Sequence, residues 1–162
     1  MGGIELESLR CERPRQEELS ADRMSAQIEA TKKLVQAASK QLDMNALDRD
    51  GVESKRPLSI RRFDAFFSIP ETNAIMVITS VGLPNEISRS GLLVYISRKS
   101  PKGIDQIVRL HTAKSTKAVG KNEALWLSSY SPEQLESLAN IISEAEPINK
   151  AMYDERNIIR EI

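Results

Sequence analysis

The chain has 162 residues, of which 40% are hydrophobic and only 4% aromatic, so we expect one compact domain with an appendage and a mainly aliphatic core. Its 23 Lys and Arg balance 23 Asp and Glu, which excludes a chain that is basic or acidic as a whole. Cys11 is the only cysteine, which excludes an intrachain disulfide and a metal site built from several thiolates.

Neither a signal peptide nor a membrane-spanning helix is expected. The first residues are polar and charged, and they lack the apolar core of a signal peptide. No segment approaches the roughly 18 consecutive apolar residues that a spanning helix needs. A single cysteine also suits a reducing compartment. We therefore expect an intracellular, cytoplasmic protein.

The charges are unevenly distributed along the chain. Residues 88–121 contain eight basic residues against one acidic residue, a net charge of +7. Residues 122–162 contain three basic and eight acidic residues, a net charge of −5. A basic middle therefore precedes an acidic C-terminal third. The basic residues of the middle block are Arg89, Arg98, Lys99, Lys102, Arg109, Lys114, Lys117 and Lys121.

A long amphipathic helix is predicted near the N-terminus, beginning at Pro14 or at Ser20. Its apolar residues recur at alternating spacings of four and three, as on one helical stripe. The stripe consists of Met24, Ile28, Thr31, Val35, Ala38 and Leu42. Gln27 is expected to face solvent. Residues 48–51, which end in a glycine suited to a left-handed cap, should end the helix and begin a linker.

Two interpretations of this helix remain open. It packs across the sheet of its own domain, or its narrow stripe pairs with another copy or with a partner. We divide the chain into an N-terminal helical arm with its linker, residues 1–55, and an α+β domain, residues 56–162.

The middle of the chain predicts an antiparallel sheet of about five strands. Residues 74–81 form a continuous apolar run that is rich in β-branched residues, which indicates a central strand buried on both faces. Residues 58–69 alternate with a slip at Arg61-Arg62 that predicts a bulge. The other predicted strands cover residues 92–98, 104–113 and 124–129.

The C-terminal third predicts two helices. Ser131 suits an N-cap, Pro132 the first helical position and Gln134 the reciprocal position of a capping box. Tyr130 and Leu135 have the spacing of a hydrophobic staple. Pro147 should stop this helix before a second, amphipathic one. Helices before and after a group of strands indicate an α+β fold.

We find no arrangement of residues that indicates catalysis. His111 is the only histidine, it lies on a predicted strand, and no nucleophile elbow accompanies it. If Gly51 is placed at the sixth position of a calcium-binding loop, Ala46 and Pro57 fall at its first and twelfth positions. The first ligand and the bidentate glutamate are then both missing, so no calcium site is expected at residues 48–51. The sequence therefore predicts no enzyme, cofactor, metal or small-molecule substrate.

The charge pattern predicts a non-enzymatic assembly or adaptor protein that self-associates and presents a basic surface to an acidic partner. The eight basic residues of the middle block are the predicted partner-binding residues. Arg98, Lys99 and Lys102 fall in one predicted loop, and Lys114, Lys117 and Lys121 fall in another. The two loops should lie at opposite ends of a hairpin, with Arg109 between them. The acidic block of another copy is one expected partner, in a head-to-tail assembly. The alternative is a structural protein that binds nucleic acid or anionic membrane, for example one associated with a viral matrix or nucleocapsid.

Overall fold

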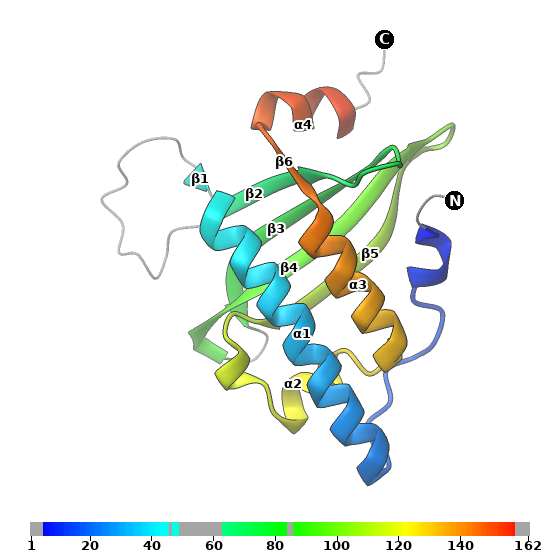
Figure 1. Cartoon of the computed structure of the whole chain (residues 1–162), viewed down its shortest axis with the longest axis vertical. Helices are drawn as coiled ribbons and strands as arrows, with labels where there is room; N and C mark the ends of the chain where they lie inside the picture. The colour runs from blue at the N-terminus through cyan, green and yellow to red at the C-terminus, as the bar shows by residue number, and fades with distance from the viewer. Residues whose placement is uncertain (1–4, 46, 49–62, 84–85, 158–162) are drawn as a thin grey trace.

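The computed structural model describes residues 5–45, 47–48, 63–83 and 86–157, and it confirms the α+β class (Figure 1). One antiparallel sheet has its strands in chain order, and a short sixth strand pairs with β2 beside β1. The strands are β1 (Leu47–Asp48), β2 (Phe63–Ser68), β3 (Ala74–Leu83), β4 (Glu86–Ser100), β5 (Gly103–Ala113) and β6 (Glu146–Ile148).

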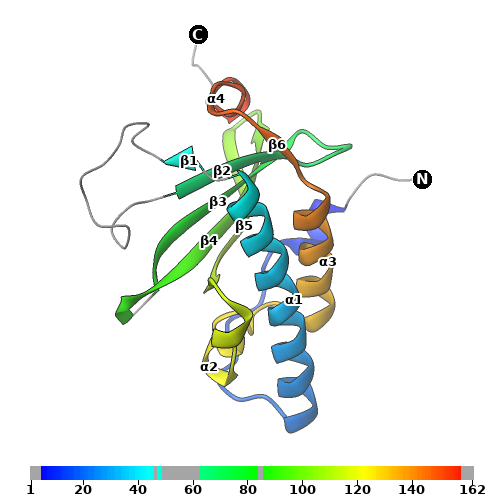
Figure 2. The ribbon, with the colours of Figure 1, turned by 60° about the vertical axis from the view of Figure 1, so that its left-hand side comes forward.

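Two long helices lie side by side on one face of this sheet and run in the same direction (Figures 1 and 2). These are α1 (Ala21–Asn45) and α3 (Pro132–Glu144). Figure 2 shows α4 (Lys150–Asn157) apart from this pair, at the end of the sheet where β6 lies. The remaining helical turns are η1 (Leu6–Leu9), η2 (Thr116–Ala118) and α2 (Lys121–Trp126).

The predicted central strand is confirmed. β3 lies between β2 and β4, and both of its faces are covered. Met76 and Ile78 on one face are fully buried, and Ile75 and Val77 on the other are almost fully buried. A run without polar alternation suits this position, because neither face of the strand meets water.

The hairpin between β4 and β5 is also confirmed. It closes at Ser100 and Gly103, where Gly103 has a φ of 121° that a residue with a Cβ rarely adopts. The Ser100 hydroxyl donates to the Gly103 carbonyl at 3.0 Å. A bulge follows the turn: Ser97 faces Gln106 and Ile96 faces Val108, so Ile107 is an extra residue in β5.

Helix α1 begins after Ser20, whose hydroxyl accepts a hydrogen bond from the Arg23 backbone N–H at 3.2 Å. Pro14 is therefore not its start, and the helix ends at Asn45, before residues 48–51. Ala30, Leu34 and Ala38 are among the residues that it buries against α3 and the sheet. This packing corresponds to the first of the two interpretations, in which the helix covers its own domain.

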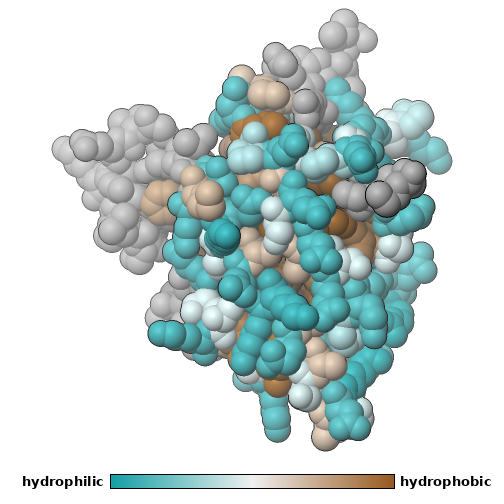
Figure 3. Space-filling model, in the orientation of Figure 1, coloured by the Kyte–Doolittle hydropathy of each residue, from teal (hydrophilic) through white to brown (hydrophobic). Residues whose placement is uncertain are grey.

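The prediction that Gln27 faces solvent is wrong. Gln27 is fully buried, and its Nε2 donates to the carbonyls of Leu127 at 2.9 Å and Tyr130 at 3.2 Å. The opposite, outward side of α1 is hydrophilic together with that of α3 (Figure 3). The helix therefore buries Gln27 in addition to its apolar stripe, because the buried carbonyls of Leu127 and Tyr130 need a hydrogen-bond donor.

The predicted fifth strand at residues 124–129 is wrong, because residues 121–126 form helix α2. The Gly120 backbone N–H donates to the Glu123 carboxylate at 2.8 Å, which satisfies an amide at the helix start. A run of four apolar residues cannot distinguish a strand from a buried helical turn. Glu123, three residues after a glycine, was the signal for the helix.

The start of α3 follows the predicted capping box. Ser131 Oγ accepts from the Gln134 backbone N–H at 3.1 Å, and Gln134 Oε1 accepts from the Ser131 backbone N–H at 2.8 Å. Tyr130 and Leu135 are both buried in the main core. The helix ends at Glu144 rather than at Pro147, and Pro147 lies in the edge strand β6, a position that proline tolerates.

Two predictions fall outside the described residues: the domain boundary at residue 55 and the bulge at residues 61–62. Within the described part of the chain, no helix combines the length and the apolar character needed to cross a bilayer.

Candidate functional site

The basic residues at the hairpin end differ in how their charges are balanced. Arg98 lies in an ion cluster with Glu7, Arg10 and Asp105, and it forms ion pairs with both acids. Arg10 Nη2 lies 2.9 Å from Glu7 Oε1 and 2.7 Å from Asp105 Oδ2. Hydrogen bonds from Arg10 are the main cause of the lowered pKa values of the Glu7 and Asp105 carboxyls. The charge of Arg98 is thus balanced within the fold.

Lys99 and Lys102 stand at the tip of the same hairpin and are exposed. Among the described residues, neither of them forms an ion pair. They carry the uncompensated charge of this end of the sheet.

Lys114, Lys117 and Lys121 lie beyond the other end of β5, and all three are exposed. Ser115 caps η2 by accepting from the Lys117 backbone N–H at 3.2 Å, and Lys121 is the first residue of α2. Ser39 of α1 donates to the Lys114 carbonyl, which fixes the start of this loop. An eleven-residue strand separates the two groups of lysines, a length of roughly 35 Å. The predicted arrangement at opposite ends of a hairpin is therefore present.

Arg109 lies between these groups on β5 and is exposed. Arg89 lies on β4, and its side chain is outside the described part of the structure. We use the name β5 basic series for the six exposed residues Lys99, Lys102, Arg109, Lys114, Lys117 and Lys121. None of the six forms an ion pair with a described acidic residue.

A cavity of about 310 Å³ opens beside Arg109, in the middle of this series. Three segments distant in sequence contribute to it: the N-terminal segment, β5 and the chain from the end of α2 to the start of α3. Its polar and aromatic lining residues are Arg15, Arg109, His111, Trp126, Ser129 and Tyr130. Leu110 and Leu127 also line it, and no acidic residue of the described part of the chain does.

The titratable groups of the cavity reflect its positive charge and partial burial. Burial, with the nearby Arg109 guanidinium, lowers the pKa of His111, so the free imidazole is mainly neutral at pH 7. Burial also raises the pKa of Tyr130 to about 12, against a hydrogen bond from the Arg109 backbone N–H that acts in the opposite direction. The phenol therefore keeps its proton at neutral pH.

Hydrogen bonds to backbone carbonyls hold the walls of the cavity in place. Gln27 binds the carbonyls of Leu127 and Tyr130 from the core side. The Ser128 hydroxyl donates to the Gln16 carbonyl at 2.6 Å and so ties the residue after Arg15 to the opposite wall. These bonds fix the backbone of two walls relative to each other.

The sequence predicts His111 as a strand residue without a catalytic role, and it gives no sign of the cavity that His111 lines. Arg15, Arg109 and Trp126 come from three segments distant in sequence, and no local pattern relates them. Within the described residues, no group of three His, Cys, Asp or Glu side chains is arranged to hold a metal ion.

Comparison of the chain with protein-family models, with curated proteins and with solved structures gives no match in any of the three.

Proposed function

We propose that this protein is a non-enzymatic adaptor that self-associates and presents the β5 basic series to an acidic partner. The observation that carries the proposal is the exposure of six cations, Arg109 on β5 and five lysines beyond its two ends, without an ion-paired acid among the described residues. Exposed cations of one sign attract an acidic surface and accelerate its encounter with the protein.

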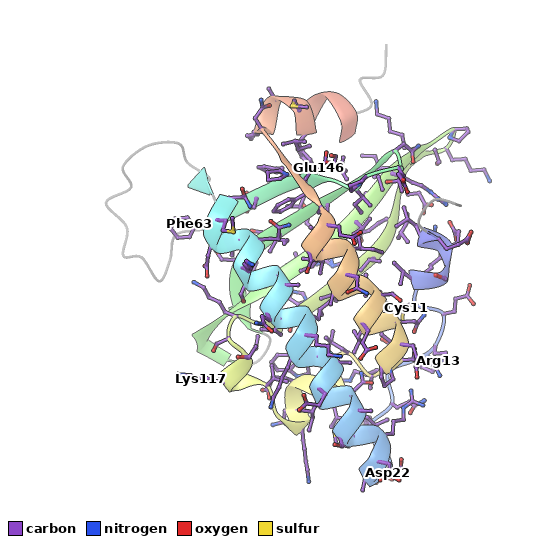
Figure 4. All side chains as sticks on the ribbon, viewed as in Figure 1. Cys11, Arg13, Asp22, Phe63, Lys117 and Glu146 are labelled. Atoms are coloured by element: carbon purple, nitrogen blue, oxygen red, sulfur yellow. The ribbon has the colours of Figure 1, made fainter. Side chains whose placement is uncertain are left out.

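Acidic residues on another part of the molecule support self-association. Glu133, Glu144 and Glu146 are exposed on α3 and just after it. Figure 4 shows Lys117 and Glu146 far apart, toward opposite ends of the molecule. Because Lys117 and Glu146 lie too far apart to pair within one chain, the acidic residues at the end of α3 in one copy can contact the lysines beyond the Ala113 end of β5 in the next. Such a contact is head-to-tail.

The lining of the cavity supports a non-enzymatic role. The only histidine of the chain lies beside an arginine, and among the described residues no carboxylate lines the cavity to orient its imidazole as in a catalytic triad. We also propose an intracellular, cytoplasmic location, which the exposed, unpaired thiol of Cys11 supports.

Sedimentation velocity at low and high ionic strength tests the proposal. We expect association at low salt that weakens at high salt, because exposed charges are screened. Replacing Lys114 and Lys117 by Gln should weaken the association constant about tenfold, since each exposed ion pair contributes roughly 0.2–1 kcal/mol. The matched control replaces Lys32 and Lys40, two lysines of α1, by Gln and should leave association unchanged.

A monomer at every concentration and salt would overturn self-association. The wild-type chain should then be titrated with a Glu-rich peptide, duplex DNA, single-stranded RNA and anionic vesicles. Salt-sensitive binding to the peptide would support the adaptor role. Stronger binding to nucleic acid or vesicles would replace it by the alternative of a nucleic-acid or membrane-binding structural protein.

A further inference from the structure

We infer that the cavity beside Arg109 binds a phosphate monoester whose esterified group is a single planar ring. This inference goes beyond the proposed function, because the cavity can hold such a group whether or not the β5 basic series engages a protein. It depends on the donor residues that line the cavity, on its aromatic wall and on the hydrogen-bonded backbone around them.

The donors match a phosphate group. Arg15 and Arg109 line the cavity, and an arginine side chain carries a planar fork of N–H groups; Ser129 and Tyr130, also in the lining, carry hydroxyl groups. A phosphate monoester carries about two negative charges near neutral pH and three strongly accepting oxygens. A single carboxylate has one charge and two oxygens, and would leave more of these donors without an acceptor. No Asp or Glu of the described residues lines the cavity, so none of them repels an anion from within the lining.

The remaining walls suit a ring. Trp126 is partly exposed, and an aromatic group can stack on its face, while Leu110 and Leu127 add apolar surface. A volume of about 310 Å³ is at the small end of the range for ligand pockets. It accommodates a phosphate with one ring better than a large ligand.

The site is organised before any ligand arrives. Tyr130 is 3% exposed, and its backbone N–H donates to the Leu127 carbonyl at 2.9 Å. Gln27 holds the Tyr130 carbonyl from inside the core. Because these bonds hold the cavity backbone in the free protein, ligand binding requires no rearrangement of that backbone.

Trp126 gives a direct signal for the test, because it is the only tryptophan in the chain. Phenyl phosphate is the probe. We expect a saturable change in Trp126 fluorescence on titration of the full-length chain, matched by one-site binding in calorimetry. No saturable change in either measurement would overturn the inference.

Arginine variants test the assignment of the donors. Arg15→Gln and Arg109→Gln should each weaken phenyl phosphate binding at least tenfold. Arg109→Lys should also weaken it, because an ammonium group cannot bind two oxygens through a planar fork. The matched control is Arg13→Gln, on the same exposed segment but outside the lining (Figure 4). An equal loss in Arg13→Gln would indicate general electrostatic attraction and overturn the inference.

Further ligands test whether the cavity prefers phosphate to carboxylate and which kind of molecule carries the phosphate. Benzoate that binds as tightly as phenyl phosphate would overturn the preference for phosphate. A phosphotyrosine peptide and a nucleoside monophosphate represent the two sources of the ester, a modified protein and a free metabolite. Tighter binding of either one supports the inference and identifies the source. Melting temperatures of all variants establish that they remain folded.

Discussion

At the scale of single residues, Gln27 and Ser131 hold the chain between α2 and α3. Gln27 reaches it from α1 through two backbone carbonyls, and Ser131 ends it by capping α3. Tyr130 lies between these two anchors and lines the cavity. Substitutions at Gln27 or Ser131 should therefore change the free energy of unfolding by a measurable amount.

Replacing Gln27 by Leu should destabilise the fold by about 1–2 kcal/mol, within the range for a buried group left without its hydrogen bond. The Leu127 carbonyl keeps a bond from the Tyr130 backbone N–H, so the Tyr130 carbonyl suffers most of the loss. Chemical denaturation measures the change. Gln36→Leu, at an exposed position of the same helix, is the control. Equal stability of the two variants would contradict a role for the Gln27 hydrogen bonds.

Replacing Ser131 by Ala should cost about 1 kcal/mol, as for other lost N-caps. In a domain of this size, the melting temperature should fall by roughly 2–4 °C. Ser137→Ala, on the exposed side of α3, serves as the control and should change it much less. Any self-association through the acidic residues of α3 should weaken in parallel. A melting temperature equal to that of the wild type would mean that the Ser131 cap does not contribute to stability.

At the scale of elements, the N-terminal segment is fastened to the edge of the sheet by charge. Arg10 binds Glu7 and Asp105, and Gln134 Nε2 donates to the Ser8 carbonyl at 2.9 Å. The segment in turn carries Arg15 to the cavity. Its attachment should therefore depend on pH.

The pKa of Asp105 is lowered in the folded protein, chiefly by Arg10. A lowered folded-state pKa contributes stability above the unfolded value of about 3.9, and this contribution is lost as the pH falls below it. Between pH 5 and pH 3, the urea midpoint of the wild type should therefore fall more than that of Asp105→Asn. Asp43→Asn, at an exposed position of α1, is the control and should follow the wild type. Parallel curves for all three proteins would contradict the ion cluster as an anchor.

At the scale of the whole molecule, α1 and α3 form one layer on the sheet rather than an independent arm. Leu34 of α1 is fully buried in the same core as the sheet residues Met76 and Val94. Gln41 of α1 also donates to the Ile142 carbonyl of α3 at 2.8 Å. The helix and the sheet should therefore unfold together.

Replacing Leu34 by Ala should destabilise the protein by about 2–5 kcal/mol, the range for a truncated core leucine. Circular dichroism of the helices and fluorescence of Trp126 should report one coincident transition. Met44→Ala is the control, because Met44 is 71% exposed and its loss should cost little. Two separate transitions would indicate that α1 folds as an arm.

The sequence by itself determined the features that depend on neighbours in the chain. The run at residues 74–81, the hairpin around Gly103 and the capping box at Ser131 follow from local periodicity, turn chemistry and capping. The separation of the two lysine groups follows as well, because a hairpin places the two ends of a strand apart. Residues 124–129 show the limit of such reasoning, since four apolar residues fit a strand or a helical turn equally.

Only the tertiary structure decided which distant groups meet. Gln27 looks like a solvent-facing residue until the carbonyls of Leu127 and Tyr130 lie beneath it, because the need for a donor arises from packing. Arg98 belongs to the basic block in sequence, yet Glu7 and Asp105 balance its charge in the fold. The cavity brings Arg15, Arg109 and Trp126 together from three segments. Local periodicity does not encode such long-range contacts, since they form only when the helices close on the sheet.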